Sequence, residues 1–426
     1  MQADLPSYGE AAALVRTFAA RLLEQSTARA GRERVALGEA AGRVLAQAIF
    51  ADQDQPPFAR STRDGFACRA AEASKHIPLR LAGSTRAGEP PAGPLPVGAA
   101  WEIMTGGAVP EDADAVAMLE HVEHGNGTIR LLPSRRVKPG ENIVAQGAQA
   151  RRGALLLSAG VPITFAQVAL AVSCGDSTVE VYARPRVAIL ATGDELVDVD
   201  AAPRPGQIRN SNAPMLAALV AAAGAEPWIL PRAADTPEAL DEALAHAAAA
   251  DLLLISGGVS AGKFDLVEPA LARRGGRFHF TGVRIQPGKP LVFGEMPCPS
   301  RSHANRKGAN LPFFGLPGNP VSSAVTFLLF GAPVVAALAG STAPTPRFAS
   351  AQLQEATDRR TKPGLTRFLP ATCNFSIPAG RLPQVNVVPW QGSGDLAALA
   401  LSNCFLVIPE EVGGLAPGER ATVLLY

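Results

Sequence analysis

The stretch from Leu252 to Asp265 constrains this chain most, because it joins a buried strand to a helix through glycines. Residues 252–255 form an apolar run that predicts a buried strand. Ser256-Gly-Gly-Val-Ser-Ala-Gly262 breaks that run, and Asp265-Leu-Val-Glu268 has the spacing of a helix capping box. Glycines let the main chain approach a ligand closely, and the first N–H groups of a helix favour anions. The stretch therefore predicts a backbone cradle for an anion, although a simple chain reversal requires the same residue types.

The region around this stretch, residues 181–340, has the pattern of an α/β domain. Short apolar runs alternate with segments that have helical spacing, and Thr236-Pro237 has the form of a helix start. Strands that alternate with helices predict an open, mostly parallel sheet. The strands are expected at 187–191, 228–230, 252–255, 283–285 and 291–293, and the helices at 212–223, from 236 and at 321–338.

The rest of the chain predicts three further parts. Residues 1–50 and 145–180 are expected to form one elongated helical region, with a capping box at Ser7–Glu10, a short helix running into a strand after Val35, and a helix at 164–174. Residues 51–144 are expected to form an inserted β module with strands at 79–81, 100–104, 115–119 and 128–132. Residues 341–426 are expected to form a C-terminal β-barrel domain with strands at 385–388, 405–408 and 420–425.

The composition argues against several classes of protein. The net charge is +1, which gives no argument for a nucleic acid or a charged membrane surface as partner. The five cysteines lie far apart without CxxC spacing, so neither a zinc site nor a disulfide framework is expected. We expect no signal peptide and no membrane span, since no apolar run reaches about 18 residues without interruption. A cytoplasmic globular protein is the default expectation.

Three turns of the α/β region are expected at the carboxyl ends of strands: Thr192–Glu195, Ser256–Asp265 and Gly315–Pro320. In an open α/β sheet, ligands bind beyond the carboxyl ends of the strands. Each turn alone is explained by ordinary helix capping, but three turns at one edge of one sheet favour a binding site.

Carboxylates gather at the same turns and suggest a metal ion. Asp194 and Glu195 end a strand, Asp235 precedes a helix, and Asp265 opens another. Asp265 has an alternative role as a helix cap and Asp235 as a turn residue. Carboxylates beside an anion cradle would repel phosphate unless Mg²⁺ lay between them. The pattern predicts a Mg²⁺-assisted site for a phosphorylated ligand, with Lys289 either neutralising the phosphate or simply solvated.

Several short sequence blocks, spread along nearly the whole chain, occur in the same order as the blocks of one known protein family. In the β module they are Pro57–Ala67, similar to PxFxxSxMDGYA, and Ile103–Val116, similar to RIMTGAPxPxGADAVV. The later blocks are Ala191–Leu196, Gly206–Asn212, Ser256–Ser260, Pro287–Pro290, Gly315–Ser322 and Gln391–Leu396. Together they resemble the molybdopterin molybdenumtransferase family, which includes the MoeA proteins and the E domain of gephyrin.

The resemblance implies an activity and an assembly. It implies a Mg²⁺-dependent transferase of molybdenum cofactor biosynthesis that inserts molybdate into adenylylated molybdopterin and releases AMP. It also implies an elongated homodimer in which the β module of one subunit lies over the α/β domain of the other, so that the subunits share each site. The molybdopterin adenylyltransferase is the partner that this chemistry suggests.

The resemblance also assigns roles to residues that match the blocks. The catalytic candidates are Asp64, Thr105, Asp235, Asp265 and Lys289. The metal candidates are Glu195 and Asp265. The candidates for binding the cofactor substrate are Ser256, Gly257, Gly258, Ser260, Pro317, Gly318, Asn319 and Pro320.

The chain departs from the family at charged positions. Arg63 replaces a methionine, Glu102 an arginine and Gln286 a lysine, and Gly147-Ala-Gln149 stands where the family has Gly-Glu-Asp. Either the protein is a divergent paralogue that binds molybdopterin or a partner without efficient catalysis, or it is a compensated enzyme. Compensation would pair Arg63 with Glu102 and use Arg367 as a substitute cation. A third hypothesis, an adenylyltransferase on the same sheet, does not account for the β modules.

Overall fold

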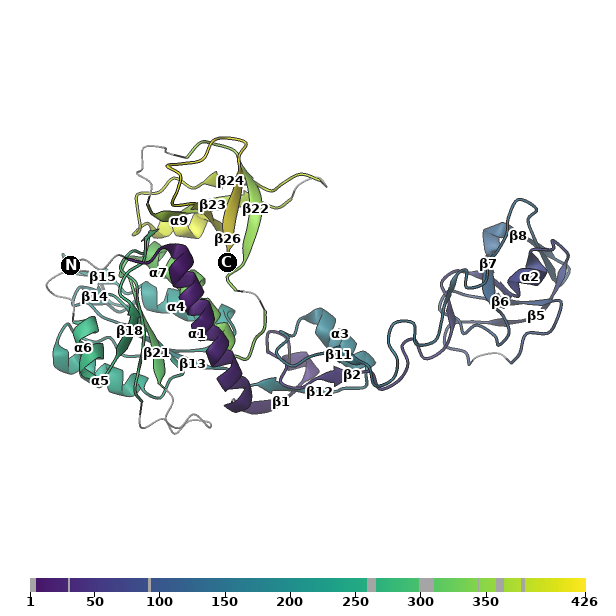
Figure 1. The fold of residues 1–426 in the computed structure, drawn as a ribbon, viewed down its shortest axis with the longest axis horizontal. Coiled ribbons are helices and arrows are strands. Elements are labelled where there is room, and N and C mark those ends of the chain that lie inside the picture. Colours follow the sequence, from purple (N-terminus) through teal and green to yellow (C-terminus); the bar gives the residue numbers. More distant parts are fainter. Residues whose placement is uncertain are drawn as a thin grey trace. The chain divides into compact units, whose positions relative to one another are not determined.

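The chain divides into two compact units, each described here by itself. The computed structural model describes residues 5–29, 31–90, 93–258, 266–298, 310–343, 345–357, 364–376 and 380–426. Unit 1 comprises residues 1–46, 159–164 and 178–426, and unit 2 comprises residues 47–158 and 165–177 (Figure 1). Unit 2 is thus an insertion into unit 1, whereas the four-part division expected from the sequence stays a prediction.

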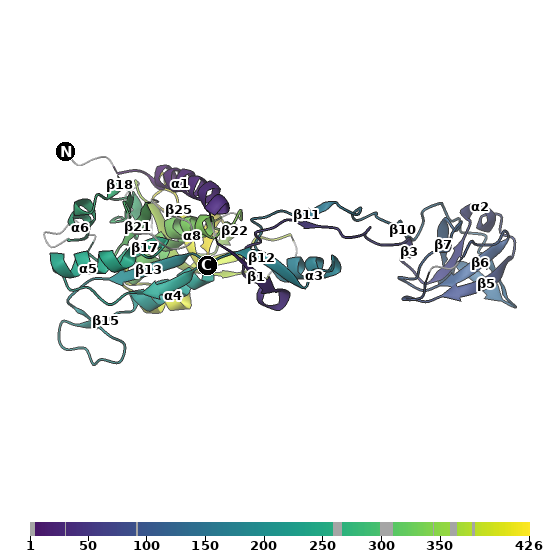
Figure 2. The ribbon, with the colours of Figure 1, turned by 90° about the horizontal axis from the view of Figure 1, so that it is seen from below.

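Unit 1 contains a six-stranded sheet. Its strands, in spatial order, are β16 (Glu226–Ile229), β13 (Arg186–Ala191), β17 (Leu252–Ser256), β21 (Leu311–Leu316), β20 (Val292–Met296) and β18 (Arg277–Phe280). The first four strands are parallel, and β20 and β18 are antiparallel to their neighbours. The predicted mostly parallel sheet is confirmed, and β13, β17 and β21 lie side by side (Figure 2).

Helices cover both faces of this sheet, because successive residues of its strands point to opposite sides. Val187 and Ile189 of β13 pack with α4 (Asn212–Ala222), and Ala188 and Leu190 pack with α5 (Pro237–Ala247) and α6 (Val267–Arg273). All four strand residues are fully buried. A parallel strand that is buried on both faces has a continuous run of apolar residues, and this run is what predicted the strand from the sequence.

One long apolar helix lies in the core of unit 1. It consists of α7 (Pro320–Thr326), the π-helical segment η3 (Phe327–Gly331) and α8 (Ala332–Leu338). By length and composition it could cross a membrane, but 83% of its most apolar window is buried within the fold. Its burial marks it as a core helix, and the cytoplasmic location stays a prediction.

The N-terminal helix α1 (Tyr8–Arg29) begins as the sequence predicts. The Ser7 N–H donates to Glu10 Oε2 at 2.8 Å and the Glu10 N–H to Ser7 Oγ at 3.2 Å, so the capping box is confirmed. The short helix expected after Val35 is wrong. Strand β1 (Arg32–Ala36) pairs there with β12 (Thr178–Tyr182), and only the 3₁₀ turn η1 (Leu37–Glu39) follows before β2 (Ile49–Phe50). Pairing between distant segments overrides the local apolar spacing.

The C-terminal strands close into a barrel, as predicted. Strand β23 pairs with both β24 and β25, which closes the ring. Strand β19 (Ile285–Gln286) adds to β23 in parallel, and α9 (Leu396–Leu401) lies between two barrel strands in sequence. The barrel strands, in spatial order, are β23 (Thr366–Asn374), β24 (Gln384–Val387), β22 (Phe348–Leu353), β26 (Arg420–Leu425) and β25 (Cys404–Ile408).

Unit 2 contains a six-stranded sheet of its own, and the four strands predicted there are confirmed. In spatial order its strands are β7 (Ala115–Met118), β4 (Gly65–Cys68), β6 (Ala99–Ile103), β5 (Leu79–Thr85), β9 (Thr128–Leu131) and β8 (Val122–Gly125). The predicted helix at 164–174 is α3 (Phe165–Ser173). The remaining elements are β3 (Arg60–Ser61), α2 (Ala70–Ala73), η2 (Leu119–His121), β10 (Ile143–Val144) and β11 (Leu155–Leu157).

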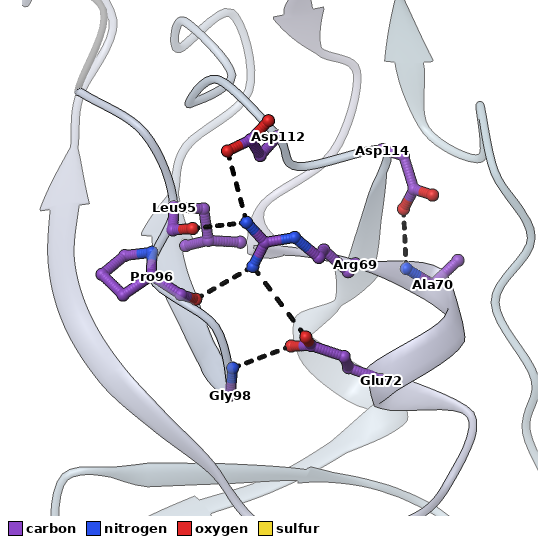
Figure 3. A network of polar contacts seen from close by, with 8 residues as sticks. All are labelled: Arg69, Ala70, Glu72, Leu95, Pro96, Gly98, Asp112 and Asp114. Atoms are coloured by element: carbon purple, nitrogen blue, oxygen red, sulfur yellow. Dashed lines mark hydrogen bonds and ion pairs between the residues drawn. The ribbon is translucent and has the colours of Figure 1, made fainter.

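A polar network ties a loop of unit 2 to the start of α2 (Figure 3). The Arg69 guanidinium donates to the carbonyls of Leu95, at 2.6 Å, and Pro96, at 3.0 Å, and forms an ion pair with Asp112 at 3.4 Å. The Asp114 carboxylate accepts from the Ala70 N–H at 2.6 Å. Two acidic residues of the Ile103–Val116 block therefore fix the position of the start of α2.

Candidate functional site

The carboxyl ends of β13, β17 and β21 open into a cavity of about 610 Å³ within unit 1. Residues from all three turns predicted to meet at this edge line it, although Ser256 and Gly257 represent the second turn, which lies outside the described residues from 259 onward. The C-terminal region also reaches it. The described lining residues are Thr192, Glu195, Leu196, Pro203, Gln207, Ile208, Arg209, Asn210, Ser211, Asn212, Ser256, Gly257, Gly318, Asn319, Pro320, Gly394 and Leu396.

The turn after β17 requires glycine. Gly257 has φ of +96° and Gly258 has φ of +64°, in the region that side chains disfavour. A Cβ on Gly257 would lie 2.7 Å from the Thr192 carbonyl oxygen. The Gly257 N–H also donates to the Leu316 carbonyl at 3.2 Å. The turn is thereby fixed against the ends of β13 and β21, while Gly257 borders the cavity.

The turn before α7 borders the cavity beside the glycine turn. Gly318, Asn319 and Pro320 line it, whereas Pro317 is buried and its carbonyl accepts from Ser323 Oγ. Asn319 Nδ2 donates to Ser393 Oγ at 2.8 Å, which brings residues of the Gln391–Leu396 block to the same cavity. Pro320 occupies the first turn of the helix, where its missing N–H costs nothing.

Sequence reasoning missed Asn212 as a site residue. Its side chain is 8% exposed, and its Nδ2 donates to Ser256 Oγ at 2.8 Å and to the Gly318 carbonyl at 2.7 Å. Its position in the Gly206–Asn212 block was the one available signal. That segment also supplies Arg209, the only cation among the described lining residues, whose Nε donates to the Val199 carbonyl at 2.9 Å.

Thr192 has a buried hydroxyl that makes no hydrogen bond within the described part of the chain. The residue is 5% exposed. Because an unpaired buried hydroxyl costs stability, we expect Thr192→Val, which has nearly the same shape, to raise the free energy of unfolding by about 1 kcal/mol. Urea unfolding of the two proteins measures the difference. A loss of stability of the same size would show that the hydroxyl is paired in solution.

The predicted carboxylates occupy different positions. Glu195 lines the cavity and is exposed. Asp235 does not line it: its N–H donates to Asp194 Oδ1 at 3.2 Å, and its carboxylate accepts from the Asp194 N–H at 3.3 Å. This exchange joins the turns that follow β13 and β16. Ser260 and Asp265 lie outside the described residues, and α6 begins at Val267.

Lys289 is exposed and is absent from the described lining of the cavity. Its carbonyl accepts from the N–H groups of Val283 and Leu291, each at 3.0 Å, so its backbone position is fixed while its side chain extends to solvent. Arg209, not Lys289, is therefore the cation that the structure brings to this cavity.

Asp64 and Thr105 form a pair within unit 2. The Asp64 carboxylate accepts from the Thr105 N–H at 2.6 Å and from its hydroxyl at 2.8 Å. These two bonds, the backbone one foremost, hold the pKa of the exposed Asp64 carboxyl below its usual value. The blocks that carry the two residues therefore act together in positioning one ionised carboxylate.

The proposed compensation for the altered charges is wrong in two respects. No ion pair joins Arg63 to Glu102, both of which are described residues. The Arg367 side chain is buried in the barrel, where its guanidinium donates to the carbonyls of Val412 and Gly413. A buried arginine bonded to backbone carbonyls stabilises the barrel and does not replace a cation at the cavity.

The described residues offer limited ligands for a metal ion. They contain no group of three or more His, Cys, Asp or Glu side chains placed to hold one. Among the residues of the cavity that the structure describes, only Glu195 provides a carboxylate. One carboxylate fits Mg²⁺ that is held largely by substrate phosphates and water, and it does not fit a metal enclosed by protein ligands.

Three family models match most of the chain. Residues 7–175 match the model for the MoeA N-terminal region (domain I and II), residues 188–337 that for a probable molybdopterin binding domain, and residues 352–426 that for the MoeA C-terminal region (domain IV). The molybdopterin biosynthesis MoeA protein of Pyrococcus horikoshii OT3 is similar in structure, with a TM-score of 0.74 and 28% identity, over 99% of this chain and 100% of that one.

Relatives in sequence agree with this assignment. The molybdopterin molybdenumtransferase of Haemophilus influenzae is 32% identical over 95% of this chain and 96% of its own length. That of Bacillus subtilis is 35% identical over 92% of this chain and 89% of its own. The chain belongs to the molybdopterin molybdenumtransferase family, a family of transferases that includes the MoeA proteins.

Proposed function

We propose that this protein inserts molybdate into adenylylated molybdopterin and releases AMP, as a step of molybdenum cofactor biosynthesis. The observation that carries the proposal is the cavity at the strand ends, which the Ala191–Leu196, Gly206–Asn212, Ser256–Ser260 and Gly315–Ser322 blocks build together. A cavity of about 610 Å³ has the size of a site for a small organic molecule.

The cavity has the groups that a phosphorylated pterin needs. The glycine turn after β17 and the N-terminus of α4 border the cavity, and the positive end of a helix dipole favours an anion. The Arg209 guanidinium adds a positive charge and Glu195 a negative one. Glu195, together with the substrate phosphates, would hold Mg²⁺, which when bound supplies positive charge that offsets the charge of the phosphates.

A protein that binds molybdopterin without efficient turnover is the second candidate. The observation that favours it is the uncompensated charge change in unit 2: Arg63 and Glu102 form no ion pair with each other, although both are described. Ala148 and Gln149 also stand where the family has two carboxylates. The cavity itself, however, keeps the glycines and prolines of its turns.

The same proposal includes a homodimer with shared sites. It also includes a molybdopterin adenylyltransferase that supplies the substrate. Exposed apolar side chains of unit 2 support self-association. Leu155 and Phe50 are partners on neighbouring strands, and Phe165 and Val172 lie seven residues apart on α3; their exposed fractions run from 53% to 87%. Large apolar side chains grouped at a surface mark contacts between proteins.

Release of AMP tests the proposed activity. The purified protein is mixed with adenylylated molybdopterin, molybdate and Mg²⁺, and AMP is followed by chromatography. We expect AMP to appear in proportion to the molybdopterin that acquires molybdenum. Tight binding of molybdopterin without AMP above background would instead favour the binding protein, and omission of Mg²⁺ tests the metal requirement.

A further inference from the structure

We propose that Asn212 is a positioning residue that holds two substrate-binding turns of the cavity at a fixed separation. It is the first residue of α4, and it borders the cavity together with Ser256, at the end of β17, and Gly318, in the turn before α7. One side chain thus joins three segments that are far apart in sequence and that each contribute to the cavity wall. This inference rests on the proposed function, because it assigns the turns to the binding of molybdopterin.

The orientation of the amide follows from its partners. The Gly318 carbonyl can only accept a hydrogen bond, so the group facing it at 2.7 Å must be Nδ2. The second hydrogen on Nδ2 is then directed to Ser256 Oγ at 2.8 Å. Both donors of the amide are used between the two turns, and no other side-chain type of this size supplies two donors from one planar group.

The remaining atom of the amide argues against a purely structural role. Asn212 Oδ1 is buried and accepts no hydrogen bond from the described residues. A buried acceptor without a partner lowers stability. This loss offsets part of the stability that the two hydrogen bonds donated by Nδ2 contribute. Such costs are typical of positions that serve a site. The same cavity wall contains the Thr192 hydroxyl, which likewise has no hydrogen-bond partner among the described residues.

The test compares two substitutions of the same kind. Asn212→Asp keeps the size of the side chain but puts an oxygen opposite the Gly318 carbonyl, which removes the bond. Asn403→Asp is the matched control, since Asn403 also bonds a distant backbone, donating to the Cys373 carbonyl at 3.0 Å and accepting from the Cys373 N–H at 2.8 Å, away from the cavity. The dissociation constant of molybdopterin and the thermal midpoint are measured for wild type and both variants.

We expect Asn212→Asp to raise the dissociation constant about 10- to 100-fold and Asn403→Asp to leave it within about twofold, although both lower the thermal midpoint. Asn212→Ser, which keeps one donor, is expected to lose less affinity, and it replaces the aspartate variant if that variant does not fold. If the Asn212 variants bound molybdopterin as tightly as wild type, or if the Asn212 and Asn403 variants lost equal affinity, this inference would be overturned while the proposed function would stand. Absence of binding by wild type would overturn the proposed function and this inference with it.

Discussion

Gly257→Ala is expected to abolish detectable binding of molybdopterin and to lower the free energy of unfolding by about 2–4 kcal/mol. The new Cβ would lie 2.7 Å from the Thr192 carbonyl oxygen, closer than nonbonded atoms approach. That oxygen belongs to the backbone, so it cannot rotate away, and the turn must move. Because the turn borders the cavity, its movement alters the surface that the substrate contacts. Fluorescence titration with molybdopterin and urea unfolding measure the two effects.

Gly418→Ala separates the clash from backbone strain. Gly418 has φ of +81°, similar to the +96° of Gly257, but a Cβ there would meet nothing within 4 Å. It should therefore cost only the strain of a left-handed alanine, about 1 kcal/mol, and leave binding unchanged. If Gly418→Ala proved as damaging as Gly257→Ala, the contact with Thr192 would not be the cause.

The edge of the sheet where the site lies was predictable from the sequence. Strands β13, β17 and β21 are apolar along most of their length, and each is followed directly by a turn rich in glycine, proline or carboxylates. Parallel strands place their carboxyl ends at one edge, so the three turns had to meet once the sheet was assigned. The capping box of α1 was also predictable, because its two bonds join residues only three positions apart.

Contacts between distant segments were not predictable. The role of Asn212 depends on Ser256 and Gly318, which lie 44 and 106 residues away. The distinction between Glu195, which lines the cavity, and Asp235, which bonds Asp194 instead, depends on which way two adjacent turns face. The sequence of a short motif does not show which way its turn faces in the fold.

Altered charges were equally hard to interpret from sequence. Two opposite substitutions, Arg63 and Glu102, suggested a compensating pair, yet the sheet register opposes Glu102 to Phe66 and leaves Arg63 in the preceding turn. Arg367 suggested a substitute cation, but its strand directs it into the barrel. Charge balance in sequence does not establish contact in space.

A mixed dimer that combines Asp64→Asn in one subunit with Arg209→Gln in the other is expected to have about half the activity of wild type, although each substitution alone lowers AMP release at least ~100-fold. Asp64 lies in unit 2 and Arg209, which lines the cavity, in unit 1. If each site takes unit 2 from one subunit and unit 1 from the other, one site of the mixed dimer carries both changes and the other carries neither. Co-expression with two affinity tags isolates the mixed dimer for the AMP assay.

The two single substitutions are suited to this test because they should leave the fold intact. Both side chains are exposed, and an asparagine at position 64 can still accept a hydrogen bond from the Thr105 N–H. Asp54→Asn is the matched control in unit 2. The Asp54 carboxylate also accepts a backbone hydrogen bond, from the Arg152 N–H at 2.9 Å, and this bond is likewise the main cause that lowers the carboxyl pKa. Because Asp54 is not a candidate site residue, we expect its substitution to leave activity unchanged.

The outcome of the mixed dimer distinguishes the possible arrangements of the site. If one chain formed its site alone, each subunit of the mixed dimer would carry one damaging change, and activity would stay as low as in the single variants. If Asp64 acted only on the stability of unit 2, its variant would lose thermal stability with its activity, and the Asp54 variant would do the same. Recovery of half the activity, with all variants equally stable, requires that the ionised carboxylate of unit 2 act on substrate bound to the partner chain.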